Sequence, residues 1–389
     1  MQKIDRLLRF LAQVSTSLEV GDQIYCVGGA VRNHLMGVAP KDVDIVVDSI
    51  ALKGKDSEWF ARQLQAKIPT RTSLVTNQYG VAILTVSGPW VLDGHSMEGE
   101  VLEIANARRE SYGDPSGKGY KPHLVEPATI LEDLLRRDFT FNTLLWRLSS
   151  LKDGPSKAEV LDLLECGRQH LQDRLVVTPV SPDQTFSDDP TRMLRAVKFA
   201  VRYGFSIPTQ TFVSIQENAH RLTQMPWDAV RKIVSDDLFG SSDPREAVRL
   251  LNRLGLAEVL KEMLTAEPGF ATALGRSLAD QDVHLSLDLL ELGWPIRTPV
   301  SFLPPAELIR LREVLESHDS QFGKRFLEFL RKPPIDQIRL FTQYRIEGQE
   351  RGKLLPVVRS IILRDPELID NPGELVSRVE NQVAKLWTS

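Results

Sequence analysis

The chain has few cysteines, little net charge and no long apolar run, and each of these absences excludes a class of protein. Only Cys26 and Cys166 occur in 389 residues, so we expect no disulfide framework or cysteine zinc site and a reducing cytoplasm. The sequence lacks a run of about 18 apolar residues, and the segment at Met1 lacks a signal-peptide layout, so we expect no membrane association. With a net charge of −4, any nucleic-acid surface must be a local basic patch.

Apolar residues make up 42% of the chain, and its length predicts two or more domains. Residues 1–20 and 56–67 follow the apolar spacing of helices. Strand-like runs occur at 24–27, 43–47, 81–86 and 100–105. They predict that this part of the chain forms a small α/β or α+β domain. The stretch 111–123 is rich in glycine, proline, serine and lysine and predicts a mobile loop. After about residue 128 the pattern is almost wholly helical, with heptad-like spacing at 246–262, 304–316, 336–342 and 353–363.

A glycine pair and an aspartate pair stand close together near the start of the chain. Gly28 and Gly29 end a short apolar run before a helix-compatible stretch, and glycine lets a backbone approach a phosphate closely. Asp42 and Asp44 belong to a strand-like run, on which residues two apart point to the same face. Adjacent carboxylates suit Mg²⁺, with substrate phosphates as further ligands. The combination indicates metal-assisted nucleotidyl transfer, whereas either pair alone is more typical of a turn or a solvated strand end.

Two adjacent arginines form a second candidate element. Arg136 and Arg137 follow the amphipathic stretch 130–135, and a guanidinium presents a rigid fork of donors that suits a triphosphate. Asp138 and Asn142 are four residues apart, which would place them on one helical face where they could bind ribose hydroxyls. An Arg-Arg-Asp sequence alone is more typical of a surface salt-bridge cluster.

A capped basic helix is predicted after residue 188. Asp189 at the cap, Pro190 in the first turn and Gly204 after the last turn bracket it. Asp189 and Arg192 are three apart, so they can touch and offer acceptors beside donors to the Watson–Crick edge of C or A. Spacings of three and four give a basic stripe of Arg192, Arg195, Lys198 and Arg202. A helix with one solvated face is the alternative for this segment alone.

Together, the segments GGAVRNHLMG…KDVDIVV, RRDFTFNTL and DDPTRMLRAVKFA resemble the motifs of class II tRNA nucleotidyltransferases (CCA-adding enzymes) and bacterial poly(A) polymerases. Both groups belong to the DNA polymerase β-like nucleotidyltransferase superfamily. The resemblance covers about residues 24–240. It implies an α+β fold in three parts: a small mixed-sheet head over 1–148, an all-helical neck over 149–240, and a helical body and tail over 241–389.

The same resemblance implies a role for each candidate residue. Asp42 and Asp44 would hold two Mg²⁺, and Glu103 is either a third metal ligand or a solvent-facing strand residue. Asp138 and Asn142 would read the ribose. The residues assigned to the triphosphate are Gly28, Gly29, Arg32 and Arg137. Those assigned to the base, or to the border of the nucleotide site, are Asp189, Arg192, Arg195 and Lys198.

The chain departs from the family pattern at several positions. Asn33 stands where the first motif has Asp after Arg32, and Asn can orient that arginine only through a neutral hydrogen bond. Asp188 replaces a Glu and Lys198 replaces an Arg, and both replacements keep the charge. The expected later motif is poorly kept, and its candidates are Arg231, Asp236 and Asp237.

The implied activity is template-free addition of CCA to the 3′ end of tRNA from CTP and ATP. The helical C-terminal half would grip the tRNA acceptor end by shape and backbone charge. The motifs leave open a poly(A) polymerase, a CC-only or A-only enzyme, and a non-catalytic RNA-binding module. The loop 111–123 lies where the family carries a flexible loop that CC-adding members lack, which favours addition of the terminal A. We interpret His318-Asp319 as a surface pair rather than a metal site.

Overall fold

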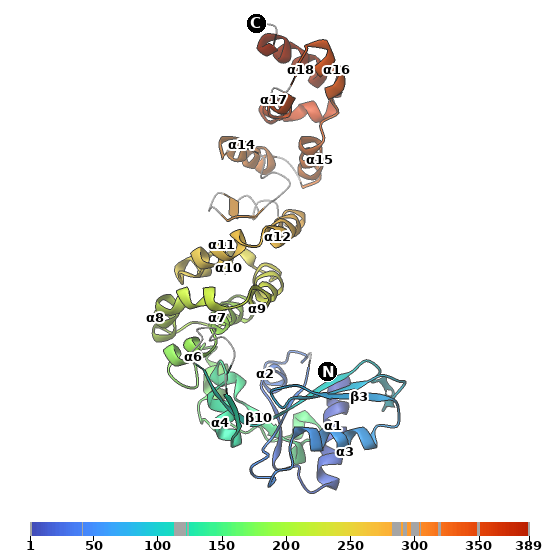
Figure 1. The fold of residues 1–389 in the computed structure, drawn as a ribbon, viewed down its shortest axis with the longest axis vertical. Helices are drawn as coiled ribbons and strands as arrows, with labels where there is room; N and C mark the ends of the chain where they lie inside the picture. The colour runs from blue at the N-terminus through green and yellow to red at the C-terminus, as the bar shows by residue number, and fades with distance from the viewer. Residues whose placement is uncertain are drawn as a thin grey trace. The chain divides into compact units, whose positions relative to one another are not determined.

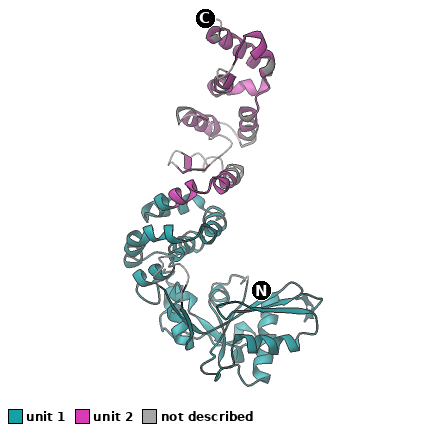
Figure 2. Cartoon of the chain, viewed as in Figure 1, with its two compact units in different colours: residues 1–259 teal, residues 260–389 magenta. Residues whose placement is uncertain are grey.

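The structure is a computed structural model that describes residues 2–40, 42–112, 122, 124–281, 289–290, 294–296, 303, 305–317, 320–347 and 351–387. The chain forms two compact units, residues 1–259 (unit 1) and 260–389 (unit 2), shown in Figure 2. Most of the predicted loop 111–123 and the dipeptide His318-Asp319 lie outside the described residues. Among the helices of the described residues, none is both long and apolar enough to cross a membrane.

Unit 1 begins with a six-stranded mixed sheet in the order β10-β1-β2-β7-β4-β3 (Figure 1). Of the five neighbouring strand pairs in this sheet, β2 with β7 is parallel and the others are antiparallel. The strands are β1 (Ile24–Val27), β2 (Asp44–Val47), β3 (Thr72–Thr76), β4 (Ala82–Val86), β7 (Val101–Asn106) and β10 (Leu145–Arg147). Four of them match the predicted strands within one residue, and the α+β prediction is confirmed.

Two helices cover the sheet and match the predicted ones. Helix α3 (Ser57–Lys67) begins where the Asp56 side chain accepts a hydrogen bond from the Trp59 amide, and it packs on β3, β4 and β7. Helix α1 (Gln2–Ser17) packs on α3, with Leu8 and Leu11 fully buried. Two short ribbons pair β5 (Val91–Leu92) with β6 (His95–Ser96) and β8 (Arg108–Ser111) with β9 (Leu124–Pro127).

The prediction of an almost wholly helical chain after residue 128 is wrong at β10. This strand returns to the sheet and pairs antiparallel with β1, with Val27 opposite Leu145. Leu145 and Trp146 are buried there, and the preceding segments are α4 (Ile130–Leu135) and the 3₁₀ turn η1 (Thr140–Asn142). A buried three-residue strand shows no apolar–polar alternation, so its sequence cannot be told from that of a buried helix.

The rest of unit 1 is helical, as predicted. The longest helix of this part is α7 (Thr191–Tyr203). Elements α6, α10 and η5 pack on α7, and α8 packs on α6. The bounds are α5 (Gly167–Gln172), α6 (Pro182–Asp188), α8 (Thr209–Asn218), α9 (Trp227–Lys232), the π-helix η5 (Ile233–Phe239), α10 (Pro244–Arg253) and α11 (Leu256–Thr265), with short 3₁₀ turns η2 (Leu148–Leu151), η3 (Pro155–Lys157) and η4 (Ala219–Gln224).

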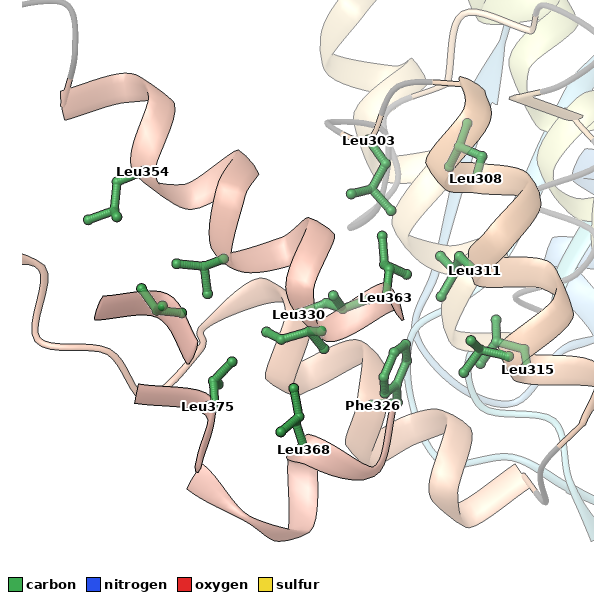
Figure 3. Packing of buried hydrophobic residues seen from close by; sticks show 14 of the residues in the cluster. Leu303, Leu308, Leu311, Leu315, Phe326, Leu330, Leu354, Leu363, Leu368 and Leu375 are labelled. Atoms are coloured by element: carbon green, nitrogen blue, oxygen red, sulfur yellow. The ribbon is translucent and has the colours of Figure 1, made fainter. Parts of the chain in front are cut away.

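Unit 2 has its own apolar core (Figure 3). Leu311 and Leu315 of α14 lie beside Phe326 of α15 and Leu363 of α17 in this core. Burial of each such side chain stabilises the unit by about 1.5–3 kcal/mol. The helices are α12 (Pro268–Gln281), α14 (Pro305–Glu316), α15 (Ser320–Arg331), α16 (Gln337–Gln343), α17 (Arg351–Arg364), η7 (Pro366–Asp370) and α18 (Pro372–Trp387).

Candidate active site

Most of the predicted site residues line one cavity of about 310 Å³ in unit 1, which we call the carboxylate cavity. Its walls come from the β1–α2 turn, the start of β2, the segment before η1, and α7. The predicted residues that line it are Gly28, Gly29, Arg32, Asp42, Asp44, Arg137, Asp138, Asn142, Arg195 and Lys198. Segments more than 150 positions apart in the sequence thus meet at one site. The predicted residues that do not line it are Glu103, Asp189 and Arg192.

The glycine pair forms the turn between β1 and α2 (Gly29–Leu35). Gly28 has φ +70°, a conformation that costs an L-residue energy. A Cβ atom at this position would lie 3.1 Å from the Arg137 Nη1 atom. The absence of a side chain at Gly28 therefore lets Arg137 reach the cavity wall.

The two aspartates enter the cavity from different local structure. Asp44 is the first residue of β2 and lies opposite Glu103 of β7, whereas Asp42 precedes the strand. Asp42 thus lies outside the strand, and both carboxylates line the cavity. Partial desolvation and the charge of Asp42 raise the pKa of Asp44, against the opposing effect of Arg137, and Glu103 adds to the rise.

The carboxylates of the cavity fit a magnesium ion that takes its other ligands from the substrate. Among the described residues, no three acidic, histidine or cysteine side chains form a ready metal cluster. Mg²⁺ in phosphoryl-transfer sites takes one or two carboxylates and completes its shell with water and phosphate oxygens. Asp42 and Asp44 supply that number of carboxylates. The pKa of Asp44 is raised first by burial and then by the negative charge of Asp42, and a bound cation would oppose both effects.

A buried carboxylate fixes both adjacent arginines. Asp133 is fully buried and accepts Arg136 at 2.6 Å and Arg137 at 3.1 Å. Burial acts to raise the pKa of Asp133, but the two guanidiniums outweigh it and hold that pKa below its usual value. Arg136 also contacts Glu110 and does not line the carboxylate cavity. Of the two arginines predicted to suit a triphosphate, only Arg137 thus faces the aspartates.

Asp138 and Asn142 hold each other rather than sharing a helix face. Asn142, in the turn η1, donates to Asp138 Oδ1 at 2.8 Å, and Arg195 pairs with Asp138 Oδ2 at 2.7 Å. Burial acts to raise the pKa of Asp138, but Arg195 and Asn142 outweigh it and lower that pKa. The second amide hydrogen of Asn142 is left for another acceptor.

Helix α7 begins one residue later than the cap prediction implies, with Pro190 at the cap. Its first residue is Thr191, and Asp189 Oδ1 accepts from the Thr191 amide at 2.9 Å and from its hydroxyl at 2.6 Å. Gly204 ends the helix in the left-handed conformation, as predicted. Arg192 Nη2 donates to the Arg136 carbonyl at 2.7 Å, and its Nε lies 3.8 Å from Asp189 Oδ2.

Asp189 and Arg192 line a second cavity of about 440 Å³ next to the first. The two cavities share the residues Arg137, Asp138 and Arg195. The second cavity is also lined by Tyr79, Arg108, Glu110, Tyr112, Pro122 and Arg136. The donor and acceptor pair predicted to select the base therefore shares the second cavity with Arg137 and Asp138 but does not line the carboxylate cavity.

Sequence reasoning left several wall residues out of the site. Asn33 accepts two hydrogen bonds from Arg32. Asp237 of η5 lines the cavity and pairs with Lys198 at 2.8 Å and Arg202 at 3.6 Å. Of the candidates for the later motif, Asp237 is the residue that reaches the cavity, whereas Arg231 pairs with Asp228. The other wall residues outside the predicted site are Val38, Ala39, Phe199 and Tyr203.

The chain is similar to known nucleotidyltransferases. The poly(A) polymerase head domain family matches residues 24–177. A tRNA nucleotidyltransferase of Schizosaccharomyces pombe is 32% identical over 212 residues, 52% of this chain and 39% of that protein. An A-adding tRNA nucleotidyltransferase of Geobacter sulfurreducens is 28% identical over 298 residues, 76% of this chain and 30% of that protein. A CCA-adding enzyme of Limosilactobacillus reuteri is 28% identical over 371 residues, 95% of this chain and 76% of that protein.

This chain thus spans well under half the length of the first two relatives, at 39% and 30%. Among solved structures, the Thermotoga maritima CCA-adding enzyme complexed with tRNA_CCA aligns with a TM-score of 0.54 and 20% identity. That alignment covers 100% of this chain and 92% of that chain, so the two share a fold. Residues 24–177 thus carry a poly(A) polymerase head domain, and the chain is similar to CCA-adding enzymes in sequence and in fold.

Proposed function

We propose that this protein is a Mg²⁺-dependent tRNA nucleotidyltransferase that adds CCA to the tRNA 3′ end from CTP and ATP. The observation that carries the proposal is the carboxylate cavity, where Asp42 and Asp44 face Gly28, Arg32 and Arg137. Acidic metal ligands beside guanidiniums are the two parts that nucleotidyl transfer needs: one set for the metal and one for the triphosphate. The names of the relatives from Limosilactobacillus reuteri and Geobacter sulfurreducens support tRNA as the acceptor.

The cavity residues have separate roles in the proposed reaction. Asp42 and Asp44 would hold Mg²⁺, which when bound supplies a Lewis acid for the RNA 3′-hydroxyl and neutralises triphosphate charge. Arg32 and Arg137 would donate to phosphate oxygens, and Gly28 leaves room for Arg137 to do so. The free amide hydrogen of Asn142 would donate to a ribose hydroxyl.

Base selection belongs to the adjoining cavity in this proposal. Asp189 Oδ1 is occupied by Thr191, but Oδ2 remains an acceptor beside the Arg192 guanidinium. Arg192 is held in place by the carbonyls of Thr185 and Arg136, so its remaining N–H groups have a fixed direction. A fixed acceptor beside fixed donors would accept the edge of C or A better than that of U or G.

The alternative of A-only addition is favoured by one observation, the likeness to the A-adding enzyme of Geobacter sulfurreducens. A CC-only enzyme and a poly(A) polymerase would use the same cavity. The three-part division at 148/149 and 240/241, the grip of the helical half on the acceptor end, and a cytoplasmic location stay predictions. Glu103 as a third metal ligand also stays a prediction, because it neighbours Asp44 without lining the cavity.

Product analysis tests the proposal. The full chain is incubated with tRNA transcripts that end before CCA or after CC, and with poly(A) primers, and the products are sequenced. CTP and ATP are supplied together and singly. We expect CCA on the first transcript and a single A on the second. If only the second transcript is extended, the protein is an A-only enzyme. If long A tails form, it is a poly(A) polymerase. No extension of any RNA would leave a non-catalytic RNA-binding module.

A further inference from the structure

One cation of the carboxylate cavity differs from the others in lacking an acidic partner. Five arginine and lysine side chains of the described residues line the cavity. Four of them pair with a carboxylate within 4.0 Å: Arg137 with Asp133 at 3.1 Å, Arg195 with Asp138 at 2.7 Å, and Lys198 and Arg202 with Asp237 at 2.8 and 3.6 Å. For the fifth, Arg32, no described carboxylate lies within that distance.

Arg32 is also deeply buried, with 9% of the residue exposed. Its polar partners are neutral amide oxygens: Asn33 Oδ1 accepts from Nε at 3.1 Å and from Nη2 at 2.7 Å, and Asn142 Oδ1 accepts from Nη1 at 2.5 Å. The guanidinium carbon lies 5.0 Å from the ring centre of Phe199, on helix α7. Burial lowers the pKa of Arg32 below its usual value.

These contacts orient the guanidinium without neutralising it. A carboxamide oxygen accepts hydrogen bonds in the same geometry as a carboxylate oxygen but carries no full charge. A buried charge without a counter-ion is costly, and an anion that enters the cavity would remove that cost. Of the two carboxamides that orient Arg32, Asn33 accepts from two of its nitrogen atoms and Asn142 from one.

We propose that Asn33 is a positioning residue that holds Arg32 as an uncompensated cation, so that the polyphosphate of the substrate becomes its counter-ion. This inference rests on the proposed function and adds to it that the neutral side chain at 33 sets the affinity for the triphosphate. Asn33 acts through Arg32 and has no contact of its own with the reacting atoms.

Three variants of the full chain test the proposal. Asn33→Asp keeps the acceptor geometry and adds a charge, whereas Asn33→Ala removes the acceptor. Leu35→Asp is the matched control, because it adds the same charge two residues further along α2, at an exposed side chain that lines a different cavity. Binding of inorganic tripolyphosphate in EDTA is measured by calorimetry, and KM and kcat for CTP are measured on a tRNA transcript.

We expect Asn33→Asp to weaken tripolyphosphate binding and raise KM for CTP by about tenfold, with kcat within about twofold of wild type. Asn33→Ala lowers kcat as well, because Arg32 loses its orientation, and Leu35→Asp changes neither quantity. Asn33→Asp melts at or above the wild-type temperature, since it gains an ion pair. A lower melting temperature, or a Leu35→Asp effect of equal size, would overturn the proposal.

The test separates this inference from the proposed function. A wild-type chain that extends no RNA but binds tripolyphosphate in an Asn33-dependent way would overturn the proposed function and support the role of Asn33. A chain that transfers nucleotides with the same KM and tripolyphosphate affinity in wild type and Asn33→Asp would overturn the role of Asn33 alone.

Discussion

At the scale of single residues, the site is held rigid by contacts that orient its cations before any ligand binds. Asp133, which is fully buried, fixes the Arg137 guanidinium at 3.1 Å, and Asn33 and Asn142 fix that of Arg32. Gly28 leaves the space that Arg137 needs. Donors fixed in advance need little reorganisation when charge develops on a phosphate, which favours catalysis.

Alanine substitutions at two glycines of positive φ test the contact of Gly28 with Arg137 apart from backbone strain. Gly28 and Gly37 have φ +70° and +69°, but a Cβ would meet Arg137 only at Gly28 and nothing within 4 Å at Gly37. Gly37→Ala is expected to destabilise the fold by about 1–2 kcal/mol, and Gly28→Ala by more, because Gly28 has ψ −122°, outside the left-handed helical region. Only Gly28→Ala should also raise KM for CTP, by at least about tenfold, because it displaces Arg137. Thermal melting and steady-state kinetics check this, and equal KM values in both variants would contradict it.

The sequence predicts single residues unevenly for a physical reason. Asp42, Asp44 and Arg137 stand in short motifs whose chemistry is local, and all three line the cavity. The hydrogen bond of Asn33 to its neighbour Arg32 was anticipated, and Asp237 was a candidate for the later motif. The contacts of Arg32 with Asn142 and of Lys198 with Asp237 were not predicted, because folding brings these partners together. Arg32 meets Asn142 across 110 positions, and Lys198 meets Asp237 across 39. A lone asparagine or aspartate carries no local signal of such a contact.

At the scale of elements, α7 does the most to join the two cavities. Its N-terminal part brings Arg192 to the second cavity, and its C-terminal part brings Lys198 and Arg202 to the first. Its helical spacing and its glycine end are readable from the sequence. Strand β10 is not, because three residues are too few to give a periodic signal, and pairing with β1 rather than propensity fixes it.

Replacement of Arg192 by lysine tests the role of α7 in base selection. Arg192 donates to the carbonyls of Thr185 and Arg136 at 3.2 and 2.7 Å, and an ammonium cannot keep both bonds and the planar donor fork. We expect discrimination of CTP and ATP over UTP and GTP to fall by at least about tenfold. Single-nucleotide incorporation assays measure it. Arg202→Lys, which keeps a cation opposite Asp237, is the control, and equal discrimination in the two variants would refute the assignment.

At the scale of the whole molecule, the chain consists of two units with separate cores, and all the residues assigned to the reaction lie in unit 1. Apolar spacing predicted α14, α16 and α17 close to their observed positions, whereas the predicted run 246–262 is divided at Leu254 and Gly255 into α10 and α11. The sequence does not reveal the boundary at 259/260, because α11 runs across it without a break in helical pattern. Which helices share a core depends on long-range packing.

A core substitution in unit 2 tests the independence of the two units. Phe326 is fully buried among leucines of α14, α15 and α17 (Figure 3). Phe326→Ala is expected to destabilise unit 2 by about 3–5 kcal/mol, through lost burial and the cavity left behind. Calorimetry should show a lower transition temperature for this unit, and the affinity for CTP should be unchanged. Loss of CTP binding in the variant would show that the carboxylate cavity depends on unit 2.

The central claim, that the carboxylate cavity transfers nucleotides, is tested most directly by single-turnover incorporation of CMP into a tRNA transcript by Asp44→Asn protein. Asparagine keeps the shape of the side chain but removes the charge that would hold Mg²⁺. The account predicts a loss of at least about 10³-fold, several kcal/mol of transition-state stabilisation. Asp42→Asn should behave alike, and Glu126→Gln on the exposed face of β9 should match wild type. Incorporation by Asp44→Asn at the wild-type rate in Mg²⁺ would contradict the account.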